Sequence, residues 1–469
     1  MELTEHRLEN LGELAYQLGV LLTLAVVVAN LALHPAIVLL VLSVAAGLLV
    51  IYERPNLGFW LLLLLIPIET IGPVTFTFSK HAKIALTVLV GIMLCVDSWG
   101  TKSKKSEDPY RWPFLLILLA GLPATLLATS PLTSLLGLIS LVVFVLYYTG
   151  VRCSDLARHG ALLLRVLLVS ALLSSVLCGF QLTRGYAGSL GSDEQQSVEA
   201  DQGFDSTLPM ISRASAAFNG PNAAGAFLAI GAVIAFVHAQ TLRSSRVWYL
   251  LAFGICWAGV LMTFSRGALL GSIAGCAFSF WSLGRWSLRH AIALAAVVAI
   301  VGAILITNDE VRSYLRIGAD LVSASPTRVD AWQAAFVLLE RNPVFGIGFY
   351  EFHGLSQGII GISDTPIHPH NGFLKALLEE GPAGGLAYLW FAVSFVWTSR
   401  SSLRRVTSRE NSWVLASIAG IGACLFTQEL FDAGFAIGTS SLAILFASLL
   451  GVQASLRSQL KTEACESAQ

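Results

Sequence analysis

The sequence predicts an all-α fold: a polytopic integral membrane protein with about 12–14 transmembrane helices and a large helical loop outside the membrane. Three observations carry this prediction. Hydrophobic residues make up 55% of the 469-residue chain. Charged residues make up only 12%, against roughly 25% in an average soluble domain. Apolar stretches long enough to cross a bilayer recur along the whole chain, and a soluble fold could not bury them all.

Each predicted span is an apolar stretch of roughly 17 to 25 residues. Pro35, Pro131 and Pro221 each stand at an expected helix start, where a missing N–H costs nothing. The third stretch is short, and only residues 33–35 separate the first two, so twelve spans would fit as well as fourteen. The predicted spans are 14–33, 35–52, 57–68, 81–98, 112–128, 131–150, 160–183, 219–239, 247–262, 266–283, 289–307, 383–399, 412–431 and 438–456.

Lysines and arginines set the expected orientation, because cytoplasmic loops carry an excess of both. Of the 29 in the chain, eighteen fall on the side that holds the N-terminus, ten fall on the other side and Arg165 lies within a span. Both termini are therefore expected in the cytoplasm. Most of the outer ten lie in two long segments, about 184–218 and 308–382, where the rule disfavours them. The chain also has 29 acidic residues, so its net charge gives no argument for a nucleic-acid partner.

This map divides the chain into five parts. They are an N-terminal transmembrane bundle (1–183), transmembrane segments with two arginine sites (184–307), an outer loop with amphipathic helices (308–382), C-terminal transmembrane helices (383–456) and a cytoplasmic tail (457–469).

Two arginines reach the outer face at different points of the chain. Arg213 ends the first outer segment, just before a helix that begins at Pro221. The apolar run from Val247 to Leu283 is too long for one span, so we expect a hairpin whose outer turn carries Arg266. Three glycines follow at four-residue steps, Gly267, Gly271 and Gly275, a ridge that lets a neighbouring helix approach closely. A lone arginine at this depth is more often an interfacial anchor than a site residue.

The second outer segment contains two predicted helices. After Ser325-Pro326, a helix-start pattern, apolar residues recur from Val329 to Leu339 and stop at Asn342-Pro343. This pattern predicts an amphipathic helix on the membrane surface, with Arg328 in its first turn as a possible additional site residue.

The second of these helices lies in HPHNGFLKALLEEGP. Pro369 suits its first turn and Gly381-Pro382 its end. His370 then falls in the first turn. A neutral imidazole there can accept a proton, although a histidine that only caps the helix would fit about equally well.

Arg213, Arg266 and His370 all reach one face of the membrane by independent counting of spans. Guanidinium groups bind phosphate oxygens in a bidentate way and stay charged. The outer segments contain no DxD pair, and the seven cysteines show no CxxC spacing, so we expect no metal and no cofactor. No nucleotide-binding motif is present. A group transfer at this face would therefore use an activated donor that is tethered to the membrane.

Four pieces of the chain resemble the O-antigen ligase/polymerase superfamily of bacterial inner-membrane proteins. In order, they are SRASAAFNGPNAAGAFLAI, TFSRGALLG, SPTRVDAWQAAFVLLERNPVFGIGFYEF and HPHNGFLKALLEEGPAGGLAYL. The resemblance covers roughly Arg213 to Leu389. The N-terminal half resembles the superfamily only in having many membrane helices.

The resemblance implies a metal-independent, inverting glycosyltransferase in the bacterial inner membrane, with its active site and large helical loop facing the periplasm. It implies a glycan donor on undecaprenyl diphosphate. It also implies that Arg213 and Arg266 bind the donor diphosphate and that His370 is the catalytic base. Possible additional residues are Lys80 or Lys83 at the donor, His368, which makes the assignment of the base ambiguous, and Asn371.

Three readings of the function remain open. The first is a ligase, whose acceptor is a sugar hydroxyl of lipid A–core, with a polymerase that joins lipid-linked repeat units as its alternative. A transporter or flippase of lipid-linked glycans is the second reading, but it would place ionisable groups at the bilayer midplane. A structural membrane scaffold, the third, would leave the convergence of two arginines and a histidine unexplained.

Overall fold

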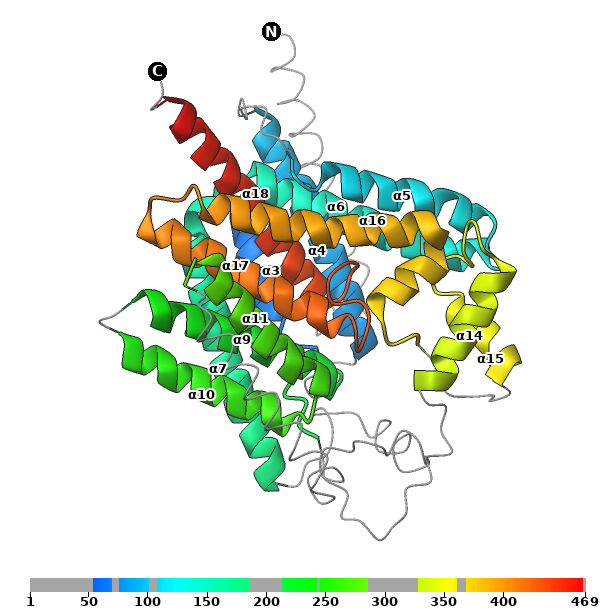
Figure 1. The fold of residues 1–469 in the computed structure, drawn as a ribbon, viewed down its shortest axis with the longest axis horizontal. Helices are drawn as coiled ribbons and strands as arrows, with labels where there is room; N and C mark the ends of the chain where they lie inside the picture. The colour runs from blue at the N-terminus through cyan, green and yellow to red at the C-terminus, as the bar shows by residue number, and fades with distance from the viewer. Residues whose placement is uncertain are drawn as a thin grey trace, which may run out of the picture. The chain divides into compact units, whose positions relative to one another are not determined.

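The computed structural model describes residues 54–69, 76–100, 108–184, 213–242, 245–285, 328–360 and 368–466. These residues are all-α, with no strand among them (Figure 1). In chain order the helices are α3 (Pro55–Leu65), α4 (Phe76–Gly100), α5 (Arg111–Leu126), α6 (Pro131–Cys153), the 3-10 helix η1 (Asp155–His159), α7 (Gly160–Arg184), α9 (Pro221–Thr241), α10 (Arg246–Met262), α11 (Arg266–Ser282), α14 (Arg328–Arg341), α15 (Phe352–Ile360), α16 (Gly372–Leu403), α17 (Arg409–Gln428) and α18 (Ser441–Glu466).

The chain separates into two units, residues 1–61 and 62–469. Only residues 54–61 of the first unit are described, and they hold the start of α3. All of the packing and site contacts below lie within the second unit.

The predicted spans that fall on described residues coincide with helices, and the chain is an all-α polytopic membrane protein. Within the described residues, four helical segments are long and apolar enough to cross a bilayer: Pro131–Cys153, Asp155–Thr183, Pro221–Thr241 and Ser441–Glu463. Exposed leucines lie on the first two of these segments, as lipid-facing helices require; Leu132 is 74% exposed and Leu173 68%. The predicted spans at 14–33, 35–52 and 289–307 lie outside the described residues, and the number of twelve to fourteen spans stays a prediction.

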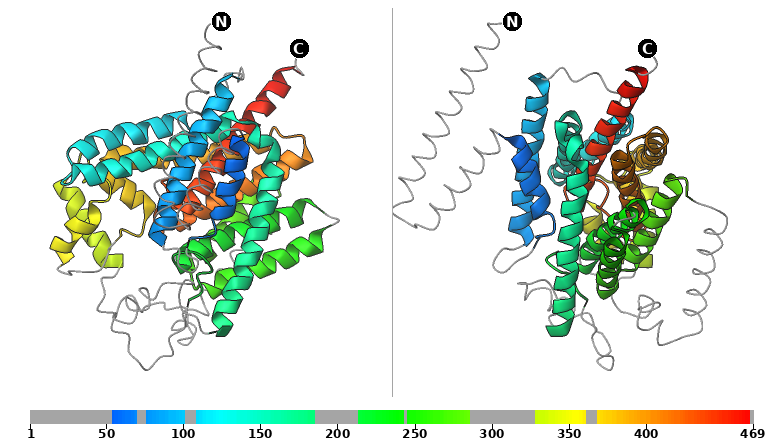
Figure 2. Two further views of the ribbon diagram at one scale, coloured as in Figure 1. Left: turned by 180° about the vertical axis from the view of Figure 1, so that it is seen from behind. Right: turned by 90° about the vertical axis from the view of Figure 1, so that its left-hand side faces the viewer.

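The predicted hairpin between Val247 and Leu283 is confirmed as α10 and α11. Its turn is closed by Ser265, whose side-chain oxygen accepts a hydrogen bond from Ala268 N–H at 3.4 Å and caps α11. Helices α9, α10 and α11 lie side by side (green in Figure 2), and α9 also packs against α7 and α17. This hairpin places Arg266 at the first position of α11.

The predicted glycine ridge of α11 is the surface on which α17 packs. A Cβ on Gly271 would lie 2.8 Å from the carbonyl oxygen of Cys424, and one on Gly275 would lie 2.6 Å from that of Gly420. Both distances are shorter than a van der Waals contact, so the two backbones touch at these positions. Glycine is required here because of close approach, as the pattern predicted.

Gly275→Ala is expected to lower the stability of the protein by about 1–3 kcal/mol, because the added methyl group forces α11 and α17 apart. The measurement is the thermal unfolding midpoint of the purified protein in detergent. Gly254→Ala in α10 is the control, since a Cβ there would meet no atom within 4 Å. Equal midpoints for the two variants would contradict the close contact.

In the outer loop, the predicted amphipathic helix is confirmed as α14, and its expected apolar stripe faces away from the rest of the protein, as a membrane-surface helix requires. Val329, Trp332 and Phe336 are 47%, 37% and 53% exposed. Small residues form the buried face instead, and they pack with α15 and the start of α16. This core consists of Ala331, Ala334, Ala335, Leu338, Ile347, Phe352 and Leu378. Contact of the outer stripe with the membrane surface stays a prediction, and the helix-start pattern at 325–326 lies outside the described residues.

The glycine-rich bend after α14 joins this core to α16. Gly346 and Gly348 have φ values of 73° and 90°, which side chains rarely adopt. The bend donates hydrogen bonds from Ile347 N–H to Leu378 O at 2.9 Å and from Gly348 N–H to Glu379 O at 3.0 Å. The first part of α16 then ends at a kink at Gly381 (φ 71°), where the sequence predicted that a helix would end.

Candidate functional site

His370 lies immediately before α16, in a strained backbone conformation. The helix begins at Gly372 and not, as expected, at Pro369, because Asn371 is its N-cap: the Asn371 side-chain oxygen accepts from Leu374 N–H at 2.9 Å. His370 has a φ of 45°, which is uncommon for any residue with a side chain. The indole N–H of Trp332 donates to the Pro369 carbonyl oxygen at 2.8 Å and holds this turn against α14.

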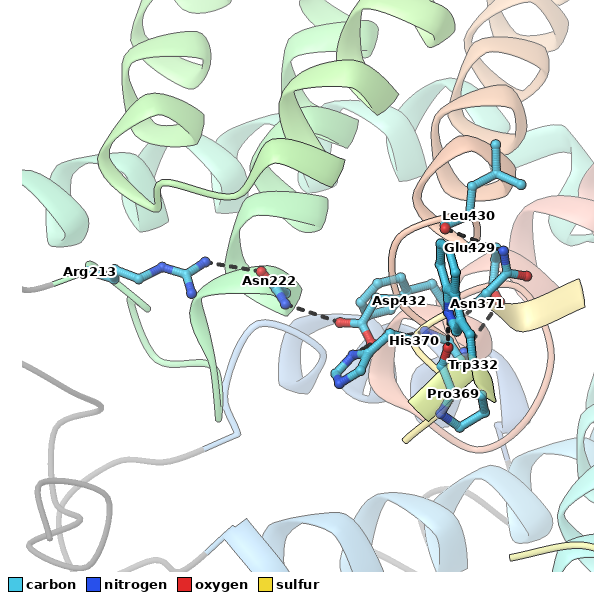
Figure 3. A network of polar contacts seen from close by, with 12 residues as sticks. Arg213, Asn222, Trp332, Pro369, His370, Asn371, Glu429, Leu430 and Asp432 are labelled. Atoms are coloured by element: carbon cyan, nitrogen blue, oxygen red, sulfur yellow. Dashed lines mark hydrogen bonds and ion pairs between the residues drawn. The ribbon is translucent and has the colours of Figure 1, made fainter. Parts of the chain in front are cut away.

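A chain of polar contacts joins His370 to Arg213 (Figure 3). Nδ1 of His370 lies 3.6 Å from Oδ1 of Asp432. The other Asp432 oxygen accepts from the Asn222 amide at 3.2 Å, and the amide oxygen of Asn222 accepts from the Arg213 guanidinium at 3.0 Å. Arg213 also donates from Nε to Thr263 O at 3.0 Å. Four separate segments of the chain therefore meet in one network.

Asp432 is held in its ionised form. Burial acts to raise its pKa, but the contact with His370, the Ala433 N–H and the Asn222 amide outweigh burial, and the pKa lies below its ordinary value. A carboxylate beside Nδ1 orients the imidazole and leaves Nε2 as the atom that can exchange a proton.

A pocket of about 490 Å³ opens beside this network. Three cationic side chains line it: Lys83 comes from α4, Arg213 from the segment before α9, and Lys375 from α16. Asp432 and Glu69 are the acidic residues in its wall. Cations converging on one polar cavity are suited to an anionic ligand such as a phosphate.

Of the two lysines considered at the sequence level, Lys83 is placed in this pocket. It is 5% exposed, and its Nζ donates to Ser441 Oγ at 3.1 Å and to Ile66 O at 3.4 Å. Lys80 lies in the first turns of α4, and Arg328 begins α14, but the side chains of both are outside the described part of the chain.

Arg266 does not line the pocket that holds Arg213 and Lys83. It lines a different pocket, of about 270 Å³, whose other residues are mostly apolar and include Leu182, Met262 and Phe264. The two arginines are nevertheless linked through one turn, because Arg213 binds the carbonyl of Thr263 three residues before Arg266.

The second histidine lies close to the first: the rings of His368 and His370 are 6.4 Å apart between centroids. Burial lowers the pKa of His368, and the positive charge of Lys375 acts in the same direction. A lowered pKa favours the neutral imidazole of His368, and the contact with Asp432 at 3.6 Å distinguishes His370 from it.

Lys375 is a pocket residue that the sequence reasoning missed. Its ammonium lies 4.0 Å from Glu379 and 5.6 Å from the centre of the Tyr350 ring. The Glu379 carboxylate raises the pKa of Lys375, so the amine remains charged at neutral pH. Burial raises the pKa values of both Glu379 and Glu380, which are 6% and 5% exposed.

Asp432 and Asn222 were also missed, although the sequence contained a sign of each. Asn222 directly follows Pro221, the expected start of a helix, and Asp432 directly follows the predicted span 412–431, near whose end Glu429 lies. Ionisable groups at the end of a membrane span are a functional-site signal in their own right.

Residues with strained backbone conformations lie at and around the site. Four residues other than glycine have positive φ among those described: Ala216, Phe264, Tyr350 and His370. Each lies within three residues of Arg213, Arg266 or His370, or lines the larger pocket itself. Such conformations cost about 1–3 kcal/mol each and cluster at functional sites.

Among the described side chains, no group of three or more histidines, cysteines or acids is placed to hold a metal ion. Positive charge at this site is supplied by lysine and arginine.

Residues 251–389 match a family model described as O-antigen ligase. No curated protein matches the chain. The match confirms the resemblance to the O-antigen ligase/polymerase superfamily and supports a ligase-like or polymerase-like glycosyltransfer that uses lipid-linked glycans. It includes Arg266, His368, His370 and Lys375, whereas Arg213 and Asp432 lie outside the matched range.

Proposed function

We propose, from the premise that residues 251–389 form an O-antigen ligase domain, that this protein transfers a glycan from undecaprenyl diphosphate to a sugar hydroxyl of lipid A–core. The reaction takes place at the periplasmic face of the inner membrane, and both termini are cytoplasmic. The observation that carries the proposal is the contact chain from Arg213 through Asn222 and Asp432 to His370. This contact chain connects Arg213, a cation that can bind the donor diphosphate, to His370, a base that can take the proton of the acceptor hydroxyl.

The donor diphosphate binds in the 490 Å³ pocket, where Arg213 and Lys83 neutralise its charge. Arg266 is the one charged residue among the described, mostly apolar residues that line the 270 Å³ pocket. That position suits the junction between a diphosphate and its polyprenyl chain, since the chain needs an apolar surface and the phosphates need a cation.

The chemical step is a single displacement. His370 Nε2 takes the proton from the acceptor hydroxyl, and the oxygen of that hydroxyl forms a bond to the anomeric carbon. The bond between this carbon and the diphosphate oxygen breaks, and undecaprenyl diphosphate leaves with the electron pair. Asp432 balances the charge on the imidazolium.

Attack from the face opposite the leaving group inverts the anomeric centre. The arginine and lysine charges do the work that a metal ion does in many other phosphate sites.

Purified protein with an undecaprenyl-diphosphate-linked glycan and lipid A–core is expected to form the ligated product, at the same rate with and without EDTA. Elongation of the lipid-linked glycan in place of ligation would identify a polymerase. Loss of activity in EDTA would contradict the metal-independent mechanism. Lack of any transfer, with movement of the donor across vesicle membranes, would instead identify a transporter.

A further inference from the structure

Glu429 joins two segments of the candidate site, and the mechanism above does not use it. It follows the last residue of α17 and is 1% exposed. Its main-chain oxygen accepts a hydrogen bond from Gly372 N–H at 2.6 Å. Gly372 is two residues after His370, so this bond fixes the start of α16 at the point where the histidine is held.

The side chain of Glu429 holds a second segment. Oε1 accepts from Phe435 N–H at 2.5 Å and from Ala436 N–H at 2.7 Å, and Oε2 accepts from Gly434 N–H at 3.4 Å. These residues belong to the loop 432–441, which forms one wall of the 490 Å³ pocket. Three backbone donors on one carboxylate fix the path of that wall.

Gly372 is required by this carboxylate. A Cβ at position 372 would lie 1.6 Å from Oε2 of Glu429 and 2.7 Å from its carboxyl carbon. Gly372 is not among the residues with positive φ, so its backbone conformation would accept alanine. The glycine is needed because the Glu429 side chain occupies the space that a methyl group would take.

We propose that Glu429 is a positioning residue: its main-chain oxygen fixes the turn that carries His370, while its carboxylate fixes the pocket wall formed by 432–441. It thereby sets the distance between the base and the bound donor. This inference rests on the proposed function, since it assigns Glu429 a role in the same site.

A neutral group can replace the Glu429 carboxylate. The Glu429 side chain is buried, and the groups that act on its carboxylate include the three N–H donors and the Lys375 charge. The other groups that face it are the Tyr388 hydroxyl, which donates to the carboxylate, and Glu380, which lines a small cavity together with Tyr388 and Glu429. A glutamine keeps one acceptor oxygen for the Phe435 and Ala436 N–H groups and avoids burying a charge.

The first test compares Glu429→Ala with Glu429→Gln. Alanine is expected to raise the donor KM and to lower kcat, by about tenfold or more in kcat/KM, because the N–H groups of the loop lose their acceptor. Glutamine is expected to restore most of both. Glu410→Ala is the control, an exposed acid in the first turn of the same helix. A glutamine variant as impaired as the alanine variant, or an alanine variant with normal kinetics, would overturn the proposal.

The second test approaches the contact from Gly372. Gly372→Ala should lower kcat/KM by about tenfold in the natural protein. The loss should be less than about threefold in the Glu429→Ala background, where the carboxylate is gone and only the Cβ of residue 429 remains, 3.3 Å from the added methyl group. Gly358→Ala in α15 is the control, since a Cβ there meets no atom within 4 Å. Equal losses in both backgrounds would show that the methyl group does not act through Glu429, and would overturn the proposal.

These outcomes differ from a failure of the proposed function. If the unmodified protein transfers glycan but Gly372 and Glu429 are not coupled, only the positioning role is wrong. If the unmodified protein transfers no glycan to any acceptor, the proposed function is wrong and the positioning role falls with it.

Discussion

Replacing His370 is expected to lower glycan transfer by about 10²–10⁴-fold, the usual contribution of a general base, while donor binding stays intact. His370→Asn is the preferred variant, because asparagine tolerates the positive φ of 45° at this position better than alanine does. It lacks a group that can take the acceptor proton. Transfer to lipid A–core gives the rate, and binding of undecaprenyl diphosphate to the purified variant gives the affinity.

His368→Ala is the matched control for that variant. The two histidines are close in space, but only His370 is paired with Asp432. We therefore expect His368→Ala to keep most of the activity. An inactive His368→Ala together with an active His370→Asn would show that the other imidazole is the base.

Arg213→Ala is expected to lower the affinity for undecaprenyl diphosphate by about 10- to 100-fold, because a charged hydrogen-bond donor contributes roughly 1.5–3 kcal/mol. The loss should appear in the donor KM more than in kcat at saturating donor. Binding of undecaprenyl diphosphate in detergent measures it directly. The variant is compared with Arg341→Ala, an exposed arginine at the end of α14. Unchanged affinity in Arg213→Ala would remove Arg213 from the donor site, whatever the effect on transfer.

The two predictions separate the halves of the site. Arg213 and His370 are joined through Asn222 and Asp432, yet one variant should lose the donor and the other only the chemical step. This separation follows from the geometry, since Arg213 lines the pocket whereas His370 contacts it through Asp432.

Much of the membrane architecture followed from local sequence properties. Apolar stretches predicted the helices, and the interruption at residues 263–267 predicted the α10–α11 hairpin. The Gly271 and Gly275 spacing predicted a close helix contact, because a four-residue step puts both glycines on one face of α11. Hydrophobicity and helical spacing are properties of neighbouring residues, so each segment of the sequence predicts its own helix without information from the others.

The face of α14 that packs against the protein was not predicted from the sequence. The sequence pattern of α14 indicated Val329, Trp332 and Phe336 as one face, and this face exists. Packing nevertheless buries the alanine face, because small side chains let α14 approach α15 and the start of α16 closely. Which of two apolar faces becomes the core depends on the shape of the neighbouring helices, and local spacing does not contain that information.

From the sequence alone came the class of the protein, its resemblance to the O-antigen ligase/polymerase superfamily, and the arginine and histidine candidates. Only the tertiary structure decided which of these residues meet. It brings Arg213 and Lys83 into one pocket, pairs His370 with Asp432, assigns Arg266 to a separate apolar pocket and joins Gly372 to Glu429. Except in the Arg266 pocket, these contacts link residues that are 50 or more positions apart along the chain. Their distances depend on how the helices pack and how the loops between them return, which no single segment of the sequence specifies.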